Sequence, residues 1–190
     1  MINWSSPLAD DEQRVFPMVV LLLDRVRRVS EQEARQVVRT ELGEHAAATV
    51  RAVGDNPAGM SYIDWRHGAT PYHLGTSSEP YINAVGVGKV DEENGITAPM
   101  KWMMREEVPP EDDAMCRAWM SHTAWLYVDA LLFQSGPEDD GLHLRHVLRI
   151  ASHFVDERCV LLWLWGGEPK RVTLPSLQAT ASLRAGEWPD

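Results

Sequence analysis

Residues 123–133 read TAWLYVDALLF, and their alternating side chains predict a long β-strand. One face of this strand carries Ala124, Leu126, Val128, Ala130 and Leu132. The other carries Trp125, Tyr127, Asp129, Leu131 and Phe133. Because both faces are largely apolar, we expect the strand to be central in its sheet or covered on both sides.

The segments that follow predict a helix, two strands and a second helix. After a turn at 136–140, an apolar stripe at helical spacing predicts an amphipathic helix that ends near Asp156. Residues 160–165 read VLLWLW, which is typical of a buried strand, and residues 171–174 are its expected partner. A last helix should begin at Pro175, run through Leu183 and stop near Gly186.

The N-terminal portion repeats this order. Residues 16–23 form an apolar run of strand length. Ser30 and Glu33 then form a capping-box pattern that opens a helix with apolar positions from Ala34 to Ala46. Residues 60–65 and 70–74 read as two strands around a turn at 66–68, and residues 81–87 could add one more strand.

These patterns predict an α+β fold of the two-layer sandwich type, with a mixed or antiparallel sheet covered by helices. We expect one domain over residues 1–190, built from two ferredoxin-like β-α-β-β halves at 15–87 and 114–186. An acidic, proline-containing connection at 88–113 would join the halves. The apolar second face of such a sheet would favour a dimer.

Composition excludes several classes of function. The chain of 190 residues has 44% hydrophobic and 24% charged residues, as expected of a globular protein without a membrane span. Its net charge of −10 repels phosphate backbones and anionic lipid surfaces, so we expect neither a nucleic-acid partner nor a membrane partner. The two cysteines, Cys116 and Cys159, favour a reducing compartment, and acids near the N-terminus are unlike a secretory signal. A cytoplasmic location is the resulting prediction.

No cofactor or metal motif is complete. Residues 84–89 read AVGVGK, but Asn83 and Val90 stand where a phosphate-binding loop needs glycine and a hydroxyl. His143, His146 and His153 follow one predicted helix without the spacing of a zinc motif, so a polar flank facing solvent is the favoured interpretation. We therefore expect no cofactor and no bound metal.

Four residues are candidates for acid–base catalysis. Asp64, His67 and His73 cluster around the predicted hairpin together with Arg66, and Asp129 would lie on an equivalent strand of the other half. Carboxylates and imidazoles gathered in a cleft can exchange protons with a substrate. The alternative is that the hairpin residues are ordinary turn residues and that Asp129, a carboxylate in an apolar strand, accepts a structural hydrogen bond from backbone.

Tryptophan is unusually frequent, with eight residues against three phenylalanines. Trp125, Trp163 and Trp165 could line a ligand pocket, since indole rings bind ligands well. Filling of the apolar core explains the same positions, and both interpretations remain open.

The second half resembles an uncharacterised bacterial domain family with duplicated strand-helix-strand-strand halves. The features that carry this resemblance lie mainly in residues 119–186. They are the run HTAWLYV at 122–128, a helix rich in leucine and alanine, the run VLLWLWG at 160–166 and the closing helix at Pro175. A fainter echo covers residues 16–74. The resemblance implies a duplicated α+β fold, and it implies no activity.

We therefore expect a non-enzymatic binding or protein-interaction module, with self-association or another protein as its partner. The alternative is a small-molecule enzyme that uses an Asp/His acid–base cluster. A closed pocket that gathers two of the candidate residues would favour the enzyme, whereas a flat apolar face buried between subunits would favour the module.

Overall fold

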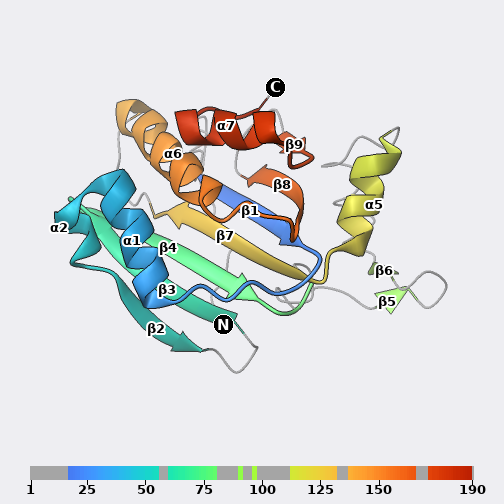
Figure 1. The fold of residues 1–190 in the computed structure, drawn as a ribbon, viewed down its shortest axis with the longest axis horizontal. Helices are drawn as coiled ribbons and strands as arrows, with labels where there is room; N and C mark the ends of the chain where they lie inside the picture. The colour runs from blue at the N-terminus through green and yellow to red at the C-terminus, as the bar shows by residue number, and fades with distance from the viewer. Residues whose placement is uncertain are drawn as a thin grey trace, which may run out of the picture.

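The computed structural model describes residues 17–55, 60–80, 90–91, 96–97, 112–131, 137–165 and 171–189. Its helices and strands follow one another along the chain as shown in Figure 1. They are β1 (Met18–Leu23), α1 (Glu31–Leu42), α2 (Glu44–Ala47), β2 (Arg51–Asp55), β3 (Met60–His67), β4 (Thr70–Ser77), β5 (Val90–Asp91), β6 (Ile96–Thr97), α5 (Asp113–Ser121), β7 (Ala124–Ala130), α6 (Pro137–Ser152), β8 (Cys159–Trp165), β9 (Arg171–Thr173) and α7 (Leu177–Ala185).

Seven strands form one antiparallel sheet in the order β2-β3-β4-β7-β1-β8-β9. This sheet and the helices packed on it confirm the predicted α+β sandwich. β7 and β1 lie at its centre, as the two apolar faces of residues 123–133 indicated. Residues 132–133 and 81–87, expected to extend β7 and to add a strand, lie outside the described residues.

The strand order does not confirm two ferredoxin-like halves. A self-contained half would keep its own strands adjacent, but β1 lies between β7 and β8, which both belong to the second half. β7 in turn lies between β4 and β1, which both belong to the first half. The division at 15–87 and 114–186 therefore stays a prediction, although strands from both ranges complete the same sheet.

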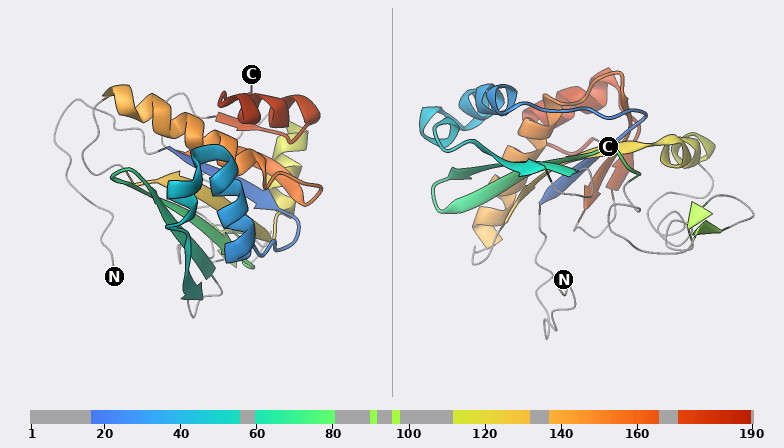
Figure 2. Two further views of the ribbon diagram at one scale, coloured as in Figure 1. Left: turned by 60° about the vertical axis from the view of Figure 1, so that its left-hand side comes forward. Right: turned by 90° about the horizontal axis from the view of Figure 1, so that it is seen from below.

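Helices α1, α2, α6 and α7 lie on one side of the sheet, which we call the helix-covered face (Figure 2). Its buried side chains include Val19, Leu21, Leu74, Leu126, Val128 and Leu162. The opposite side, the second face, carries Val20, Leu22, Trp125 and Trp163, which pack against Trp119 of α5. Among the described residues, the sheet thus has one helical layer on the helix-covered face and one helix against part of its second face.

Helix α1 begins where the capping-box pattern predicted, because Oγ of Ser30 accepts a hydrogen bond from the backbone N–H of Glu33 at 3.1 Å. The expected continuation to Ala46 was wrong. Gly43 has φ of +88°, a conformation that glycine adopts without strain, and it separates α1 from the short helix α2.

Strand β2 was missed by the sequence analysis. It is an edge strand whose side chains Arg51, Ala52 and Val53 are exposed, so it has no apolar face to recognise. Helix α1 secures this edge, since Glu31 accepts a hydrogen bond from the backbone N–H of Ala52 at 2.9 Å and Arg35 donates to the carbonyl of Val50 at 2.9 Å. These two bonds fix the strand that carries Arg51.

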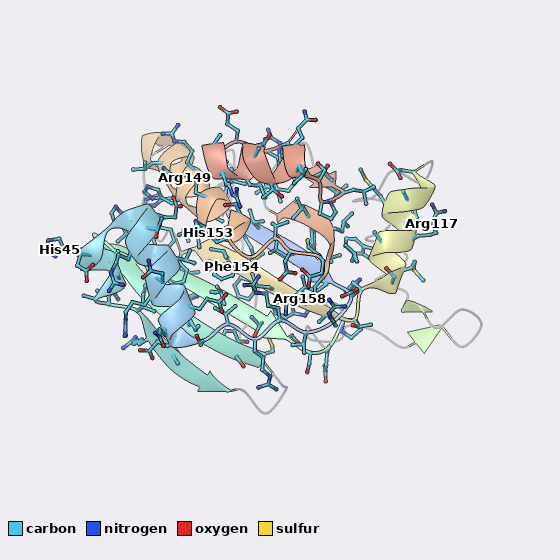
Figure 3. All side chains as sticks on the ribbon, viewed as in Figure 1. His45, Arg117, Arg149, His153, Phe154 and Arg158 are labelled. Atoms are coloured by element: carbon cyan, nitrogen blue, oxygen red, sulfur yellow. The ribbon has the colours of Figure 1, made fainter. Side chains whose placement is uncertain are left out.

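Helix α6 begins at Pro137, inside the segment expected to be a turn, and proline is common at the first position of a helix. Glu41 of α1 joins the two long helices. Its carboxylate lies 2.8 Å from Nε of Arg149 and 2.7 Å from Nε2 of His153. Arg149 and His153 are labelled in Figure 3. His153 therefore has a structural contact and is not simply part of a solvated flank.

Candidate functional site

Four polar side chains lie opposite one another on adjacent strands of the second face, and we call them the polar row. Arg51 of β2 is the register partner of Asp64 of β3, and Asp64 is the partner of His73 of β4. His73 is in turn the partner of Asp129 of β7. Directly opposite residues in a sheet share a face, so the ladder itself brings these four groups together.

The contacts within the polar row are long. Nη2 of Arg51 lies 3.8 Å from Oδ2 of Asp64, and Oδ1 of Asp64 lies 3.6 Å from Nε2 of His73. Nδ1 of His73 lies 3.7 Å from Oδ1 of Asp129. These distances exceed those of hydrogen bonds, so the side chains interact only electrostatically. Their hydrogen-bonding atoms therefore remain available to a ligand.

Burial shifts the proton affinities of the inner two groups. Burial raises the pKa of Asp129 to about 7, opposed by a hydrogen bond from the His73 backbone and assisted by the Asp64 charge. Burial also lowers the pKa of His73, although the Asp64 carboxylate works in the opposite direction. Near neutral pH, Asp129 is therefore divided between its protonated and charged forms while the His73 imidazole is mostly neutral. The Asp129 side chain is 16% exposed, and its Oδ1 has no hydrogen-bond partner among the described residues.

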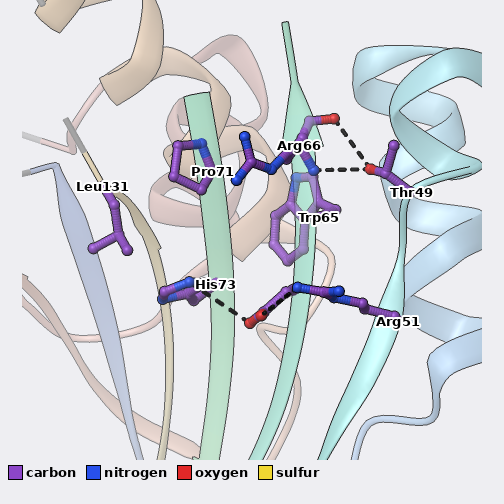
Figure 4. Close-up of a pocket in the computed structure, with 8 residues that line it drawn as sticks. Thr49, Arg51, Trp65, Arg66, Pro71, His73 and Leu131 are labelled. Atoms are coloured by element: carbon purple, nitrogen blue, oxygen red, sulfur yellow. Dashed lines mark hydrogen bonds and ion pairs between the residues drawn. The ribbon is translucent and has the colours of Figure 1, made fainter. Parts of the chain in front are cut away.

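A pocket of about 500 Å³ lies along the polar row (Figure 4). This volume is within the range of small-molecule sites. The residues that line the pocket are Thr49, Arg51, Asp64, Trp65, Arg66, Pro71, His73 and Leu131. The row thus contributes an arginine, a carboxylate and an imidazole to one concave surface, with Asp129 behind His73.

Thr49 holds the backbone of β3 at the rim of this pocket. Its Oγ1 accepts a hydrogen bond from the N–H of Arg66 at 2.8 Å. The single proton of the hydroxyl is donated to the carbonyl of Ala46 at 2.7 Å, with the carbonyl of Arg66 farther away at 3.3 Å. Thr49 therefore anchors the Arg66 N–H beyond the end of the pairing of β3 with β2. The Arg66 side chain lies beside Pro71 on the pocket wall (Figure 4).

Three of the four candidate catalytic residues therefore converge, namely Asp64, His73 and Asp129. His67 does not join them. Its ring meets that of His146 edge-on with 5.2 Å between centroids, whereas His146 also lies against Tyr72, a member of the helix-covered core. The sequence placed His67 near the others along the chain, but the alternation of β3 directs it to the opposite face from Asp64.

A second group of polar side chains lies on the helix-covered face, and sequence reasoning missed it. We call it the Tyr72 network: Thr70 and Tyr72 of β4 with His143 and His146 of α6. The Tyr72 hydroxyl lies 2.6 Å from Nδ1 of His143 and 3.2 Å from Nδ1 of His146. Oγ1 of Thr70 lies 3.3 Å from Nε2 of His143.

The expectation that these histidines face solvent was wrong for His143, which is 7% exposed. The available signal was spacing, since His143 precedes the buried Val147 by four residues and so lies on the same side of α6. Burial, with the charges of His67 and His143 as smaller causes, lowers the pKa of His146 to about 4. Burial raises the pKa of Tyr72 above its usual range. Tyr72 and His146 are therefore uncharged at neutral pH, and the network joins α6 to β4.

Trp125 and Trp163, two of the tryptophans proposed as ligand-binding residues, do not line the pocket. Trp125 is 3% exposed and stacks on Tyr127 with centroids 5.4 Å apart. Trp163 is 2% exposed and meets Trp119 of α5 edge-on at 5.5 Å. Both fill the core of the second face, which leaves a ligand-binding role as a prediction. The side chain of Trp165 lies outside the described residues.

Across the described ranges, no group of three or more His, Cys, Asp or Glu side chains has the arrangement of a metal site. Within the same ranges, every helix is too short or too polar to cross a membrane.

Comparison with known proteins adds no identity to this geometry. No family model matches the chain, and neither a curated protein nor a solved structure matches it.

Proposed function

We propose that this protein binds a small polar molecule in the pocket beside the polar row. The observation that carries this proposal is the combination of a hollow of about 500 Å³ with the loosely spaced groups Asp64, His73 and Asp129. Shifted proton affinities beside a concave surface are typical of functional sites. A purely structural ion network would be closely hydrogen-bonded, and this row is not.

Chemical-shift mapping on the full ¹⁵N-labelled chain tests this proposal. A collection of small polar metabolites is added, and we expect at least one to shift amide signals at Thr49, Asp64 and His73 together. His73→Gln should weaken that binding about tenfold, the effect of losing one good polar contact. His45→Gln is the matched control, because His45 is exposed on α2 (Figure 3). A collection that leaves these signals unchanged would contradict the proposal.

A second candidate function is a small-molecule enzyme that transfers protons. The specific observation is the contact between His73 and Asp129. Burial lowers the pKa of His73 and raises the pKa of Asp129 to about 7. Such a pair can take a proton from a bound substrate at one atom and return it at another. Binding alone does not require Asp129, since this residue does not line the pocket.

Hydrogen exchange separates the two candidates. Each molecule that binds is incubated with the protein in D₂O, and its own C–H signals are followed by proton NMR. The enzyme should replace a C–H hydrogen with deuterium, and Asp129→Asn should slow this exchange about 100-fold or more. If every ligand binds without hydrogen exchange and without conversion, the enzyme candidate is contradicted and the binding function alone is supported.

Self-association, or binding to another protein, remains a further proposal. The argument for it was the apolar second face, but Val20, Leu22 and Trp163 of that face are buried against α5. The exposed large apolar side chains of the described residues each lie on a different segment and are Val26, Val53, Met120, Leu142 and Leu177. Sedimentation equilibrium measures the mass in solution, and a monomer at all concentrations would remove self-association from this proposal.

We also propose a reducing, cytoplasmic compartment and membership of the bacterial family that the second half resembles. Both Cys116 and Cys159 are free thiols, and burial raises the pKa of Cys159 to about 12, which makes it unreactive. Alkylation of the protein as extracted from cells should modify both thiols after unfolding. A disulfide between them would contradict the compartment.

A further inference from the structure

The pocket has two ends of different charge. Arg66 lies at the rim, and its guanidinium has no carboxylate partner among the described residues. The floor is formed by Asp64 and His73, with the Asp129 carboxyl behind them. A guanidinium on a pocket wall is suited to a carboxylate or phosphate, because it can donate two parallel hydrogen bonds to two oxygens.

A ligand with a single charge would be attracted to one end of the pocket and repelled by the charge at the other end. An anion placed on the floor meets the carboxylate of Asp64, and Arg51 compensates that charge only from 3.8 Å with a side chain that is 75% exposed. A simple cation would suit Asp64 but would lie close to Arg66 and Arg51. The electrostatics therefore favour a molecule that carries both charges.

The spacing of the two ends limits the size of that molecule. Asp64 and Arg66 are two residues apart on β3, so their side chains share a face and their Cα atoms are about 7 Å apart. Thr49 holds the backbone at Arg66 in place, because its Oγ1 accepts a hydrogen bond from the Arg66 N–H at 2.8 Å. His73, whose imidazole is mostly neutral, lies 3.6 Å from Asp64 and can accept a further hydrogen bond on the floor.

From these contacts we propose that the ligand is a small zwitterion of the amino-acid type, with its anionic group on Arg66 and its ammonium group on Asp64 and His73. This inference rests on the proposed small-molecule binding and adds the chemical class. It makes Arg66, a member of the polar cluster at the predicted hairpin, a specificity residue.

Isothermal titration of the full chain with matched probes tests the class of ligand. The zwitterions are glycine, L-alanine, β-alanine and γ-aminobutyrate, while L-lactate and ethylamine each keep only one of the two charged ends. We expect at least one zwitterion to bind about tenfold more tightly than either of the last two probes, since each end contributes a charge-assisted contact. Arg66→Met should lower the affinity for that zwitterion about tenfold or more, and Arg66→Lys should lower this affinity less.

Arg117→Met is the matched control, because Arg117 is an exposed arginine on α5 at a distance from the pocket (Figure 3). Thermal melting of each variant shows whether it is folded before affinity is compared. Equal affinity for L-lactate and the zwitterions, or an unchanged affinity in Arg66→Met, would overturn the inference. If another metabolite shifts the pocket signals while the zwitterions do not bind, the inference fails and the proposed function stands. If no compound of either set binds, both fail.

Discussion

Tyr72 and His73 are neighbours on β4, but they belong to two polar groups that differ in burial and in the spacing of their contacts. Tyr72 points to the helix-covered face, is fully buried and lies 2.6 Å from a nitrogen of His143. His73 points to the second face, is 27% exposed and lies 3.6 and 3.7 Å from its two carboxylate neighbours. The Tyr72 network is closed and hydrogen-bonded, whereas the polar row is accessible and loosely spaced. The difference indicates that the first group stabilises the fold and that the second is available to a ligand.

The largest expected effect concerns the helix-covered face. Leu74, the next inward-facing residue after Tyr72, is 1% exposed in the main core. Leu74→Ala removes buried methyl groups and leaves a cavity, so it should lower the free energy of unfolding by about 2–5 kcal/mol. Urea denaturation measures this change. His73→Gln is the comparison on the same strand and should lower the free energy of unfolding by less. A loss as large as that of Leu74→Ala would mean that the second face at His73 contributes as much to stability as the helix-covered core.

The polar row should affect stability through pH. Because Asp129 has a raised pKa of about 7, the folded protein keeps a proton that the unfolded chain loses near pH 4. Stability from this group is therefore complete below pH 4, falls as pH rises to about 7 and is constant above that value. The slope for one group is at most about 1.4 kcal/mol per pH unit.

Asp129→Asn should remove that slope and make the protein more stable than wild type at pH 8, while the two match near pH 4. Denaturation curves at several pH values measure the difference, which cancels the contributions of His146 and other groups that both proteins share. An Asn variant less stable than wild type at pH 8 would show that the carboxylate is favourably paired.

A smaller effect is expected where the second face is tightly packed beyond the pocket. A Cβ atom added at Gly75 would lie well inside contact distance of the Tyr127 ring, its register partner on β7. Gly75→Ala should therefore cost about 1–3 kcal/mol by overpacking. The double variant with Tyr127→Leu should recover part of that loss, and a simple sum of the two single effects would show that the ring does not cause it.

The smallest expected effect concerns the Tyr72 hydroxyl. Tyr72→Phe keeps the ring stacked on Trp65 at 5.7 Å but removes the group that His143 and His146 share. We expect a loss of about 0.5–1.5 kcal/mol in the free energy of unfolding and no change in ligand binding at the pocket. Denaturation and the ligand titration measure the two properties on the same sample. Weakened ligand binding in this variant would show that the Tyr72 network and the polar row act as one site.

The sequence was sufficient for the elements with a strong apolar pattern. The alternation of residues 123–133 predicted which side chains of β7 share a face, and it identified Asp129 as a carboxylate that burial must perturb. The helix starting at Ser30 was recognised because a cap and an apolar stripe are local features. Local patterns of this kind do not depend on which strands are neighbours.

Long-range pairing explains what the sequence could not provide. β1 pairs with β7 and β8, more than 90 residues away along the chain, and nothing in its composition specifies those neighbours. The exposed edge strand β2 has no apolar face, so neither it nor the position of Arg51 was predicted. The burial of His143 depends on Tyr72, which is 71 residues away. Asp64 and His73 were selected for their proximity in a hairpin, and their cross-strand pairing followed from that turn.

The most direct test of the difference between the two faces is a ¹³C NMR pH titration of the Asp129 carboxyl carbon in the full chain. An accessible but desolvated polar row predicts a midpoint near pH 7. A midpoint at or below the ordinary value of 3.8 would mean that Asp129 is held as a charged partner in a structural ion network, which would contradict the description of the polar row as loosely spaced and available to a ligand.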